Sequence, residues 1–182
     1  MPTTSVVIPT FNRERFIEEC VESVMCQTSQ PDEIIVVDDG SVDNTREILE
    51  TVGFSDALNG ETPLQYIFQN NKGVSSARNA GIKASKSEYI ALLDSDDHWE
   101  KNKLEKQMAG LRKESFSSRL SHTDEKWIRN GVKVNARKKH AKSGGDIFLK
   151  CLKLCCISPS SSLIHRSVFD DFGYFDENLL AC

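Results

Sequence analysis

Short apolar runs alternate along the chain with stretches in which apolar residues recur every three or four positions. The short runs are rich in β-branched residues and end in polar or turn-forming residues, which is typical of buried strands. Apolar residues at three- and four-residue spacing indicate helices that pack one face on a sheet. This pattern predicts strands at 5–8, 33–37, 64–68 and 89–93 and helices near 16–25, 44–49, 75–84 and 101–111. Such alternation indicates βαβ units, and therefore an α/β fold with a mostly parallel sheet and helices on both faces.

The pattern weakens after Leu111. Residues 113–145 are polar, with strand candidates at 121–124 and 127–134. An amphipathic helix is predicted over 146–155, and Cys151 and Cys155 would lie on its apolar side as small buried side chains. A strand at 160–164 and a short helix at 167–172 complete the expected elements. The six cysteines form no CxxC pair, so the sequence gives no support to a zinc site. This cysteine usage favours a reducing, cytoplasmic compartment.

Composition narrows the class of protein. The chain has 182 residues, of which 38% are hydrophobic and 27% charged, and this is ordinary for one globular domain. We expect no membrane-spanning helix, because no apolar stretch approaches the length that a bilayer requires. We also expect no secretory signal, because the N-terminal residues lack a basic flank followed by a long apolar run.

Charge is unevenly distributed along the chain. The net charge of −4 argues against a nucleic-acid-binding protein. The segment 112–142 nevertheless carries ten basic and three acidic residues, a local charge of +7. One interpretation is a solvated basic loop. The other is a surface that docks on an anionic acceptor or on the inner face of a membrane, because clustered cations attract anions.

Polar clusters follow three of the predicted strands, at 38–41, 70–73 and 94–97. In open α/β sheets, ligands bind beyond the carboxyl ends of the strands, so these clusters are the candidate site. Asp94 and Asp96 could hold Mg²⁺ or Mn²⁺ together with substrate phosphates, or could bond only to their own loop. Asp38 and Asp39 have the same two interpretations, with a nucleobase or ribose as the ligand.

Motifs of other nucleotide-binding and hydrolytic enzymes are missing. The sequence has no GxGxxG after the first strand, no GxxxxGK[ST] and no GxSxG. This weakens assignment to dinucleotide dehydrogenases, P-loop NTPases and serine hydrolases.

Four segments, taken in their order and spacing, carry a resemblance to a known family: SVVIPTFNR from residue 5, VVDDGSVDNT from 36, NKGVSSARNAG from 71 and LLDSDD from 92. Together they closely resemble family 2 glycosyltransferases, an inverting group with the GT-A fold. The strong match spans 3–111, and a weaker one covers 159–177. The resemblance implies a Rossmann-like GT-A fold, with a donor-binding half at 1–111 and an incomplete acceptor-side portion at 112–182.

The resemblance also implies roles for individual residues. Asp39 would bind the uracil edge, Gly73 and Arg78 would close over the nucleotide, and Asp96, aided by Asp94, would hold Mn²⁺ or Mg²⁺. Charge stabilisation of the leaving diphosphate is the chemistry expected of that cation. The full set of expected nucleotide-binding residues is Pro9, Thr10, Phe11, Asn12, Arg13, Asp38, Asp39, Gly73, Arg78, Asp94 and Ser95.

The resemblance places the general base of an inverting transfer in an acidic pair that would lie beyond Cys182. Asp176 and Glu177 lie in the segment that leads to this pair, and we expect them to form a surface turn and not to act as the general base. The expected reaction is metal-dependent transfer of a sugar from a nucleotide-sugar, with UDP as the expected nucleotide, to a glycan or lipid-linked acceptor in cell-envelope polysaccharide biosynthesis. A nucleotidyltransferase and a non-catalytic fragment that binds nucleotide-sugars are the alternatives.

Overall fold

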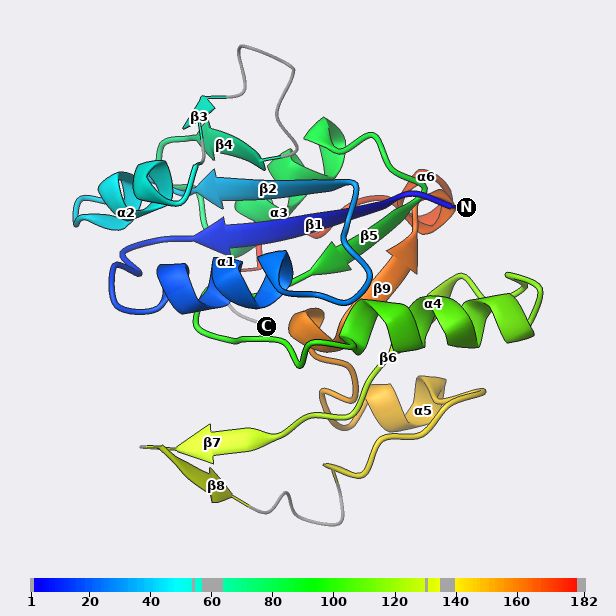
Figure 1. Ribbon diagram of the computed structural model, residues 1–182. Coiled ribbons are helices and arrows are strands. Elements are labelled where there is room, and N and C mark those ends of the chain that lie inside the picture. The colour runs from blue at the N-terminus through cyan, green and yellow to red at the C-terminus, as the bar shows by residue number, and fades with distance from the viewer. Residues whose placement is uncertain (1, 54, 57–63, 130, 135–139, 180–182) are drawn as a thin grey trace.

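The computed structural model describes residues 2–53, 55–56, 64–129, 131–134 and 140–179. A seven-stranded sheet in the order β3-β4-β2-β1-β5-β9-β6 forms its centre, and β7 and β8 form a separate hairpin (Figure 1). The strands are β1 (Thr4–Thr10), β2 (Glu33–Asp38), β3 (Ser55–Asp56), β4 (Leu64–Phe68), β5 (Tyr89–Leu92), β6 (Leu120–His122), β7 (Trp127–Arg129), β8 (Val132–Val134) and β9 (Ser162–His165). The helices are α1 (Ile17–Met25), α2 (Thr45–Thr51), α3 (Val74–Ala84), α4 (Lys103–Lys113), α5 (Phe148–Cys151) and α6 (Ser167–Phe172), with a 3₁₀ turn, η3, at Pro159–Ser161.

The sheet is mostly parallel, which confirms the prediction from the alternating pattern. β1 pairs in parallel with β2 and β5, and β2 pairs in parallel with β4. Two antiparallel strands then extend the sheet, because β9 pairs with β5 and β6 pairs with β9. Segments from the second half of the chain therefore complete the sheet that the first half begins.

Helices cover both faces of the sheet, as predicted (Figure 1). Every residue of β1 and of β2 is buried, as expected for central parallel strands between two helical layers. On one face α1, α2 and α4 pack on the alternate strand residues, and on the other face α3 and α6 do so. The odd and even positions of each central strand therefore belong to different hydrophobic clusters.

Helix α3 approaches the sheet unusually closely at Gly81. A Cβ atom at this position would lie 2.3 Å from a side-chain methyl carbon of Val7 and 3.1 Å from one of Val37. Because only glycine avoids that overlap, Gly81 fixes the depth at which α3 rests on β1 and β2. The same helix carries Arg78 toward the carboxyl ends of these strands.

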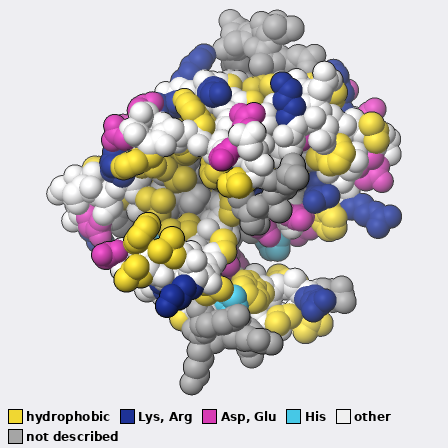
Figure 2. Space-filling model, turned by 180° about the vertical axis from the view of Figure 1, so that it is seen from behind, with side chains coloured by type: hydrophobic (Ala, Val, Ile, Leu, Met, Phe, Trp, Pro, Cys, Tyr) yellow, Lys and Arg dark blue, Asp and Glu magenta, His cyan; other side chains and the backbone are white. Residues whose placement is uncertain are grey.

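The part of the chain around β7, β8 and α5 is built differently. All residues of β7 and β8 are exposed, and α5 contains no buried residue. The helix predicted over 146–155 is wrong in extent, since α5 has only four residues, and Cys151 and Cys155 are exposed rather than buried. Figure 2 shows hydrophobic side chains on the surface of this lower part of the molecule. Among the described residues, no helix is both long enough and apolar enough to cross a membrane.

Candidate functional site

A cavity of about 500 Å³ lies at the carboxyl ends of β1, β2 and β5. It sits where the connections leave these parallel strands, the position expected for a ligand in an open α/β sheet. Its lining residues are Pro9, Thr10, Phe11, Arg13, Asp39, Asn71, Gly73, Val74, Ala77, Arg78, Asp94, Ser95 and Asp96.

Most of the residues singled out in the sequence meet in this cavity. Of the predicted nucleotide and metal residues, all but Asn12 and Asp38 line it. Asn71, Val74 and Ala77 also line it and were not predicted. Their position in the 70–73 loop and on the first turns of α3, beside Gly73 and Arg78, is the signal that could have found them.

Two buried polar atoms on the cavity wall have no hydrogen-bond partner within the described part of the protein: Thr10 Oγ1 and Arg78 Nε. An unpaired buried polar group costs about 1–3 kcal/mol, so it is uncommon without a reason. Both residues are buried and line the cavity. A polar ligand in the cavity could form a hydrogen bond with each of these two atoms.

Asp39 holds the loop that forms one wall of the cavity. Its Oδ1 accepts hydrogen bonds from Gln69 Nε2 at 2.6 Å and from the Lys72 backbone N–H at 2.9 Å, and its Oδ2 accepts one from the Gly73 N–H at 2.8 Å. Gly73 has a φ of +90°, which favours glycine. A carboxylate has about four acceptor positions, so Asp39 keeps capacity for one more donor.

Asp38 and Asn12 lie next to the cavity but have structural partners. Asp38 Oδ1 accepts from the Ser41 N–H at 2.8 Å and its Oδ2 from the Tyr66 hydroxyl at 2.8 Å, and the residue is buried. Asn12 Oδ1 accepts from the Val42 N–H at 2.9 Å. These bonds fix the turn after β2, and a direct role of either residue in nucleotide binding stays a prediction.

Arg78 and Asp94 form a largely buried ion pair across the cavity wall. Arg78 Nη2 lies 2.6 Å from Asp94 Oδ1, and their side chains are 6% and 30% exposed. Arg78 is thus paired with an aspartate. The pair leaves the Nε–H group of Arg78 without a partner among the described residues.

The loop after β5 concentrates negative charge. Ser160 Oγ accepts a hydrogen bond from the Asp94 N–H at 3.0 Å and donates one to Asp97 Oδ2 at 2.6 Å. Burial raises the pKa of the Asp97 carboxyl, and the charges of Asp94 and Asp96 raise it further, whereas the Ser160 hydrogen bond lowers it. Burial, and then the same three aspartates, also raise the pKa of the Cys20 thiol.

This loop fits a hard divalent cation only in part. Asp94 and Asp96 offer carboxylate oxygens, which Mg²⁺ and Mn²⁺ prefer, and their negative charge disfavours further anions unless a cation is present. Within the described ranges, however, no three His, Cys, Asp or Glu side chains are grouped so that they could hold a metal. A cation here would need further oxygen ligands from a bound substrate.

A second cavity, of about 950 Å³, adjoins the first and shares Asp96 with it. Trp99, Lys103 and Trp127 line it together with acidic residues that include Asp97 and Glu125. Lys103 is buried beside Trp99, with Nζ 3.9 Å from the ring centroid, and burial lowers its pKa to about 7.

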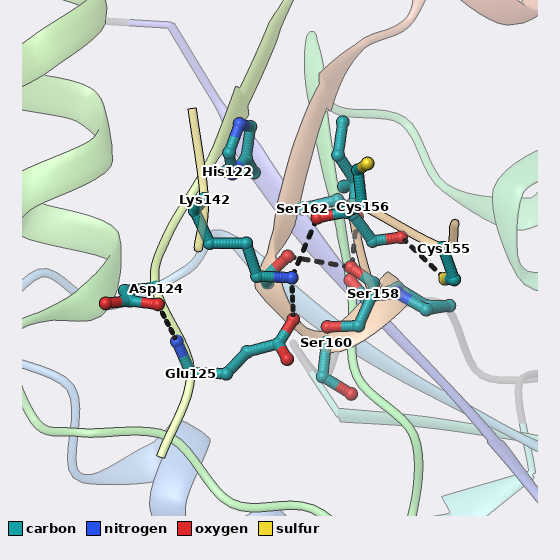
Figure 3. A network of polar contacts seen from close by, with 12 residues as sticks. His122, Asp124, Glu125, Lys142, Cys155, Cys156, Ser158, Ser160 and Ser162 are labelled. Carbon is teal, nitrogen blue, oxygen red and sulfur yellow. Dashed lines mark hydrogen bonds and ion pairs between the residues drawn. The ribbon is translucent and has the colours of Figure 1, made fainter. Parts of the chain in front are cut away.

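Polar contacts hold Glu125, one of the residues that line this second cavity (Figure 3). Lys142 Nζ lies 2.6 Å from Glu125 Oε1 and donates to the Cys156 carbonyl at 2.8 Å. Burial alone would raise the pKa of Glu125, but hydrogen bonds from Lys142, Ser158 and Trp127 outweigh it, and the pKa is lowered. The ion pair and the hydrogen bond of Lys142 together thus join three separate segments of this region.

Comparison with known proteins identifies glycosyltransferases that are similar to this chain. The chain is 35% identical to a glycosyltransferase of Rickettsia bellii over 175 residues, which cover 96% of this chain and 24% of that protein. It is 38% identical to the teichuronic acid biosynthesis glycosyltransferase TuaG of Bacillus subtilis over 114 residues, 63% of this chain and 44% of TuaG. The chain thus spans less than half the length of these two relatives.

A similar solved structure is that of S. aureus TarS, residues 1–349, in complex with UDP. Its TM-score is 0.79 at 25% sequence identity, and the match covers 99% of this chain and 52% of that one. TarS is also known in complex with UDP-GlcNAc. The model for glycosyl transferase family 2 matches residues 5–173. Because that match spans most of the chain, and the fold is that of GT-A enzymes, the chain belongs to family 2 of the glycosyltransferases, as its motifs predicted.

Proposed function

We propose that this chain is the donor-binding part of a glycosyltransferase that transfers a sugar, with inversion, from a UDP-sugar to a glycan or lipid-linked acceptor. The observation that carries the proposal is the cavity at the carboxyl ends of β1, β2 and β5. It brings together the predicted donor residues and leaves two of their buried polar atoms unpaired. The UDP and UDP-GlcNAc complexes of TarS support uridine as the base.

The base and the ribose are assigned to the walls formed by β1 and the 69–73 loop. Phe11 is 43% exposed at the mouth of the cavity and can stack on a pyrimidine. Asp39 retains one acceptor position, which suits the ring N–H of uracil. Arg78 can donate to oxygen atoms of the nucleotide through the N–H groups that Asp94 does not occupy.

The diphosphate is assigned to the loop after β5. Asp96, with help from Asp94, would hold Mn²⁺ or Mg²⁺, which would neutralise the charge that develops on the departing diphosphate. Since two carboxylates do not complete a coordination shell, we expect the cation and the nucleotide to bind cooperatively. Ser160 keeps this loop in place by bonding at once to the Asp94 N–H and to the Asp97 carboxylate.

The acceptor is assigned to the second cavity, because it meets the first at Asp96. The partly exposed Trp127 and the polar groups around it suit a saccharide, which offers hydroxyl groups and apolar ring faces. The general base of the transfer is placed on none of the described residues.

Membrane contact through the basic segment 112–142 is a separate proposal with less support. Three basic residues of that segment are already paired with carboxylates: Arg119 with Asp171, Lys126 with Glu100, and Lys142 with Glu125. This reduces the charge available to an anionic surface. Sedimentation with anionic vesicles tests the proposal.

Titration calorimetry with UDP, GDP and TDP, each with and without Mn²⁺, tests the donor assignment. We expect UDP to bind most tightly and Mn²⁺ to increase its affinity. Failure of all three nucleotides to bind in the presence of Mn²⁺ would reject the proposed function.

Replacement of Asp96 tests the metal assignment. Asp96→Asn should weaken UDP binding about tenfold or more in Mn²⁺ and leave the affinity measured in EDTA unchanged, because only the metal-mediated contact is lost. Asp170→Asn, in α6 at the opposite end of the sheet, removes one negative charge far from the cavity and serves as the control (Figure 1). Equal losses with and without metal would contradict the assignment.

A further inference from the structure

Asn79 ties helix α3 to a segment almost one hundred residues later in the chain. Its side-chain Nδ2 donates to the Phe175 carbonyl at 2.9 Å and to Glu177 Oε1 at 2.8 Å, and its Oδ1 accepts from the Phe175 N–H at 3.0 Å. The residue is only 2% exposed. Both amide protons and the amide oxygen are thus used to bind one short stretch of chain, which gives a fixed register between the two segments.

This tether places the Phe175 ring between two groups. On one side the ring packs on the hydrophobic cluster of β1, β5 and α3, with Phe169 at a centroid distance of 6.4 Å. On the other side it faces the guanidinium of Arg78, whose Cζ lies 5.6 Å from the ring centroid. Phe175 therefore separates the apolar core from the buried cation of Arg78, which lines the cavity at the carboxyl ends of β1, β2 and β5.

The contact with the ring has a specific consequence for Arg78. An aromatic face attracts a guanidinium without occupying its N–H donors. Asp94 pairs with Nη2, and Nε has no partner among the described residues. The guanidinium is thus held by an ion pair at one end and by a ring, while donors remain for oxygen atoms of a ligand in the cavity.

We propose that Asn79 and Phe175 are positioning residues for the donor. The hydrogen bonds of Asn79 hold the Phe175 ring against Arg78, and the ring orients the guanidinium toward a nucleoside diphosphate. The inference rests on the proposed function and extends it beyond the residues that line the cavity. It predicts that the order of the 175–177 segment and the affinity for the nucleotide are coupled.

A double-mutant cycle with UDP and Mn²⁺ tests the proposal. Phe175→Leu keeps an apolar side chain but removes the aromatic face, and we expect affinity to fall about tenfold, the scale of a desolvated cation–π contact. In the background of Arg78→Gln the same change should cost little, because the cation that the ring positions is already gone. Phe175→Tyr should keep wild-type affinity.

The control cycle combines Phe175→Leu with Asp39→Asn, at another residue that lines the cavity, and there the two losses should multiply. Thermal unfolding of each variant shows whether the fold is intact. The proposal is overturned if Phe175→Leu binds UDP like the wild type, or if its loss and that of Arg78→Gln are independent.

A second measurement needs no nucleotide and therefore separates this inference from the proposed function. In Asn79→Ala the ring is still present but its tether is lost, so the ¹H–¹⁵N NMR signal of Arg78 Nε should move as the ring leaves the guanidinium. An unchanged signal would reject the tether even if UDP binds, and a shifted signal would support it even if the donor assignment failed.

Discussion

The sheet with its covering helices and the region of β7, β8 and α5 are organised by different forces. In the first, β1 and β2 are buried along their whole length, and helices cover both faces. In the second, the strands and the helix contain no buried residue, and the Glu125–Lys142 ion pair joins the segments. A strand pattern thus produces a core only where helices are available to cover both of its faces.

The difference has a consequence for the two cavities. The first cavity lies at the carboxyl ends of the buried strands β1 and β2, so its walls are fixed by close packing. The second cavity is lined in part by exposed residues such as Trp127 and Ile128 and is held by polar contacts. We therefore expect substitutions to be tolerated more readily around the second cavity than under the first.

Two leucines test the comparison with the largest expected effect. Leu49 is fully buried under the sheet, and Leu149, on α5, is 74% exposed. Leu49→Ala should lower the free energy of unfolding by about 2–5 kcal/mol, since it leaves a cavity in the core. Leu149→Ala should change it by less than about 0.5 kcal/mol. Chemical denaturation measures both, and similar losses would show that α5 is covered by packing absent from this structure.

Replacing each of two helical glycines by alanine should change the stability by a smaller amount, and in opposite directions. Gly81→Ala should destabilise by about 1–3 kcal/mol, because the new methyl group would overlap Val7. Gly110→Ala, in α4, meets no atom within 4 Å and should stabilise by up to about 1 kcal/mol through helix propensity. The thermal midpoints of the two variants should lie on either side of the wild type. A stable Gly81→Ala variant would mean that α3 can move away from the sheet.

The smallest expected effect is a pH-dependent loss of stability in the region of β7, β8 and α5. The pKa of Glu125 is lowered from its ordinary value of 4.5, so its ion pair stabilises the fold above that pH and ceases to do so as pH falls through the lowered value. Glu125→Gln should cost about 1 kcal/mol at pH 7, and the cost should shrink below about pH 4.5.

Glu50→Gln is the matched control for that prediction. Glu50 pairs with Arg46 in α2, but both side chains are about half exposed, at 56% and 49%. Its loss should be no more than about 0.5 kcal/mol. If the two variants lose the same stability at pH 7, the Glu125 pair contributes no more than a surface pair.

The sequence predicted the sheet well because burial on both faces leaves a strong pattern. The runs at 33–37 and 64–68 correspond to β2 and β4 almost residue for residue, and the short helix predicted at 167–172 is α6. The polar clusters at 38–41, 70–73 and 94–97, which contribute residues to the first cavity, could also be predicted, because parallel strands bring their carboxyl ends to one edge. The other predicted residues of that cavity came from the resemblance to family 2 glycosyltransferases. The antiparallel pairing of β9 and β6 was not predicted, since short strands carry no signal of direction.

Local polar geometry was harder to predict. Asn12 was predicted to bind the nucleotide, but its side chain bonds to the turn after β2. The apolar spacing over 146–155 suggested a covered helix, but a spacing pattern does not show whether any surface is present to cover it. The tether between Asn79 and Phe175 joins residues too far apart for periodicity to connect them.

The antiparallel strand β9 also determines where the protein could be cut. Ser160, just before it, bonds to the Asp94 N–H, and its carbonyl accepts from Trp99 Nε1 at 2.8 Å. A fragment that stopped at residue 111 would leave these donors without acceptors and the outer edge of β5 open to other chains. The loops that line the first cavity and the last third of the chain must therefore be expressed together as one folding unit.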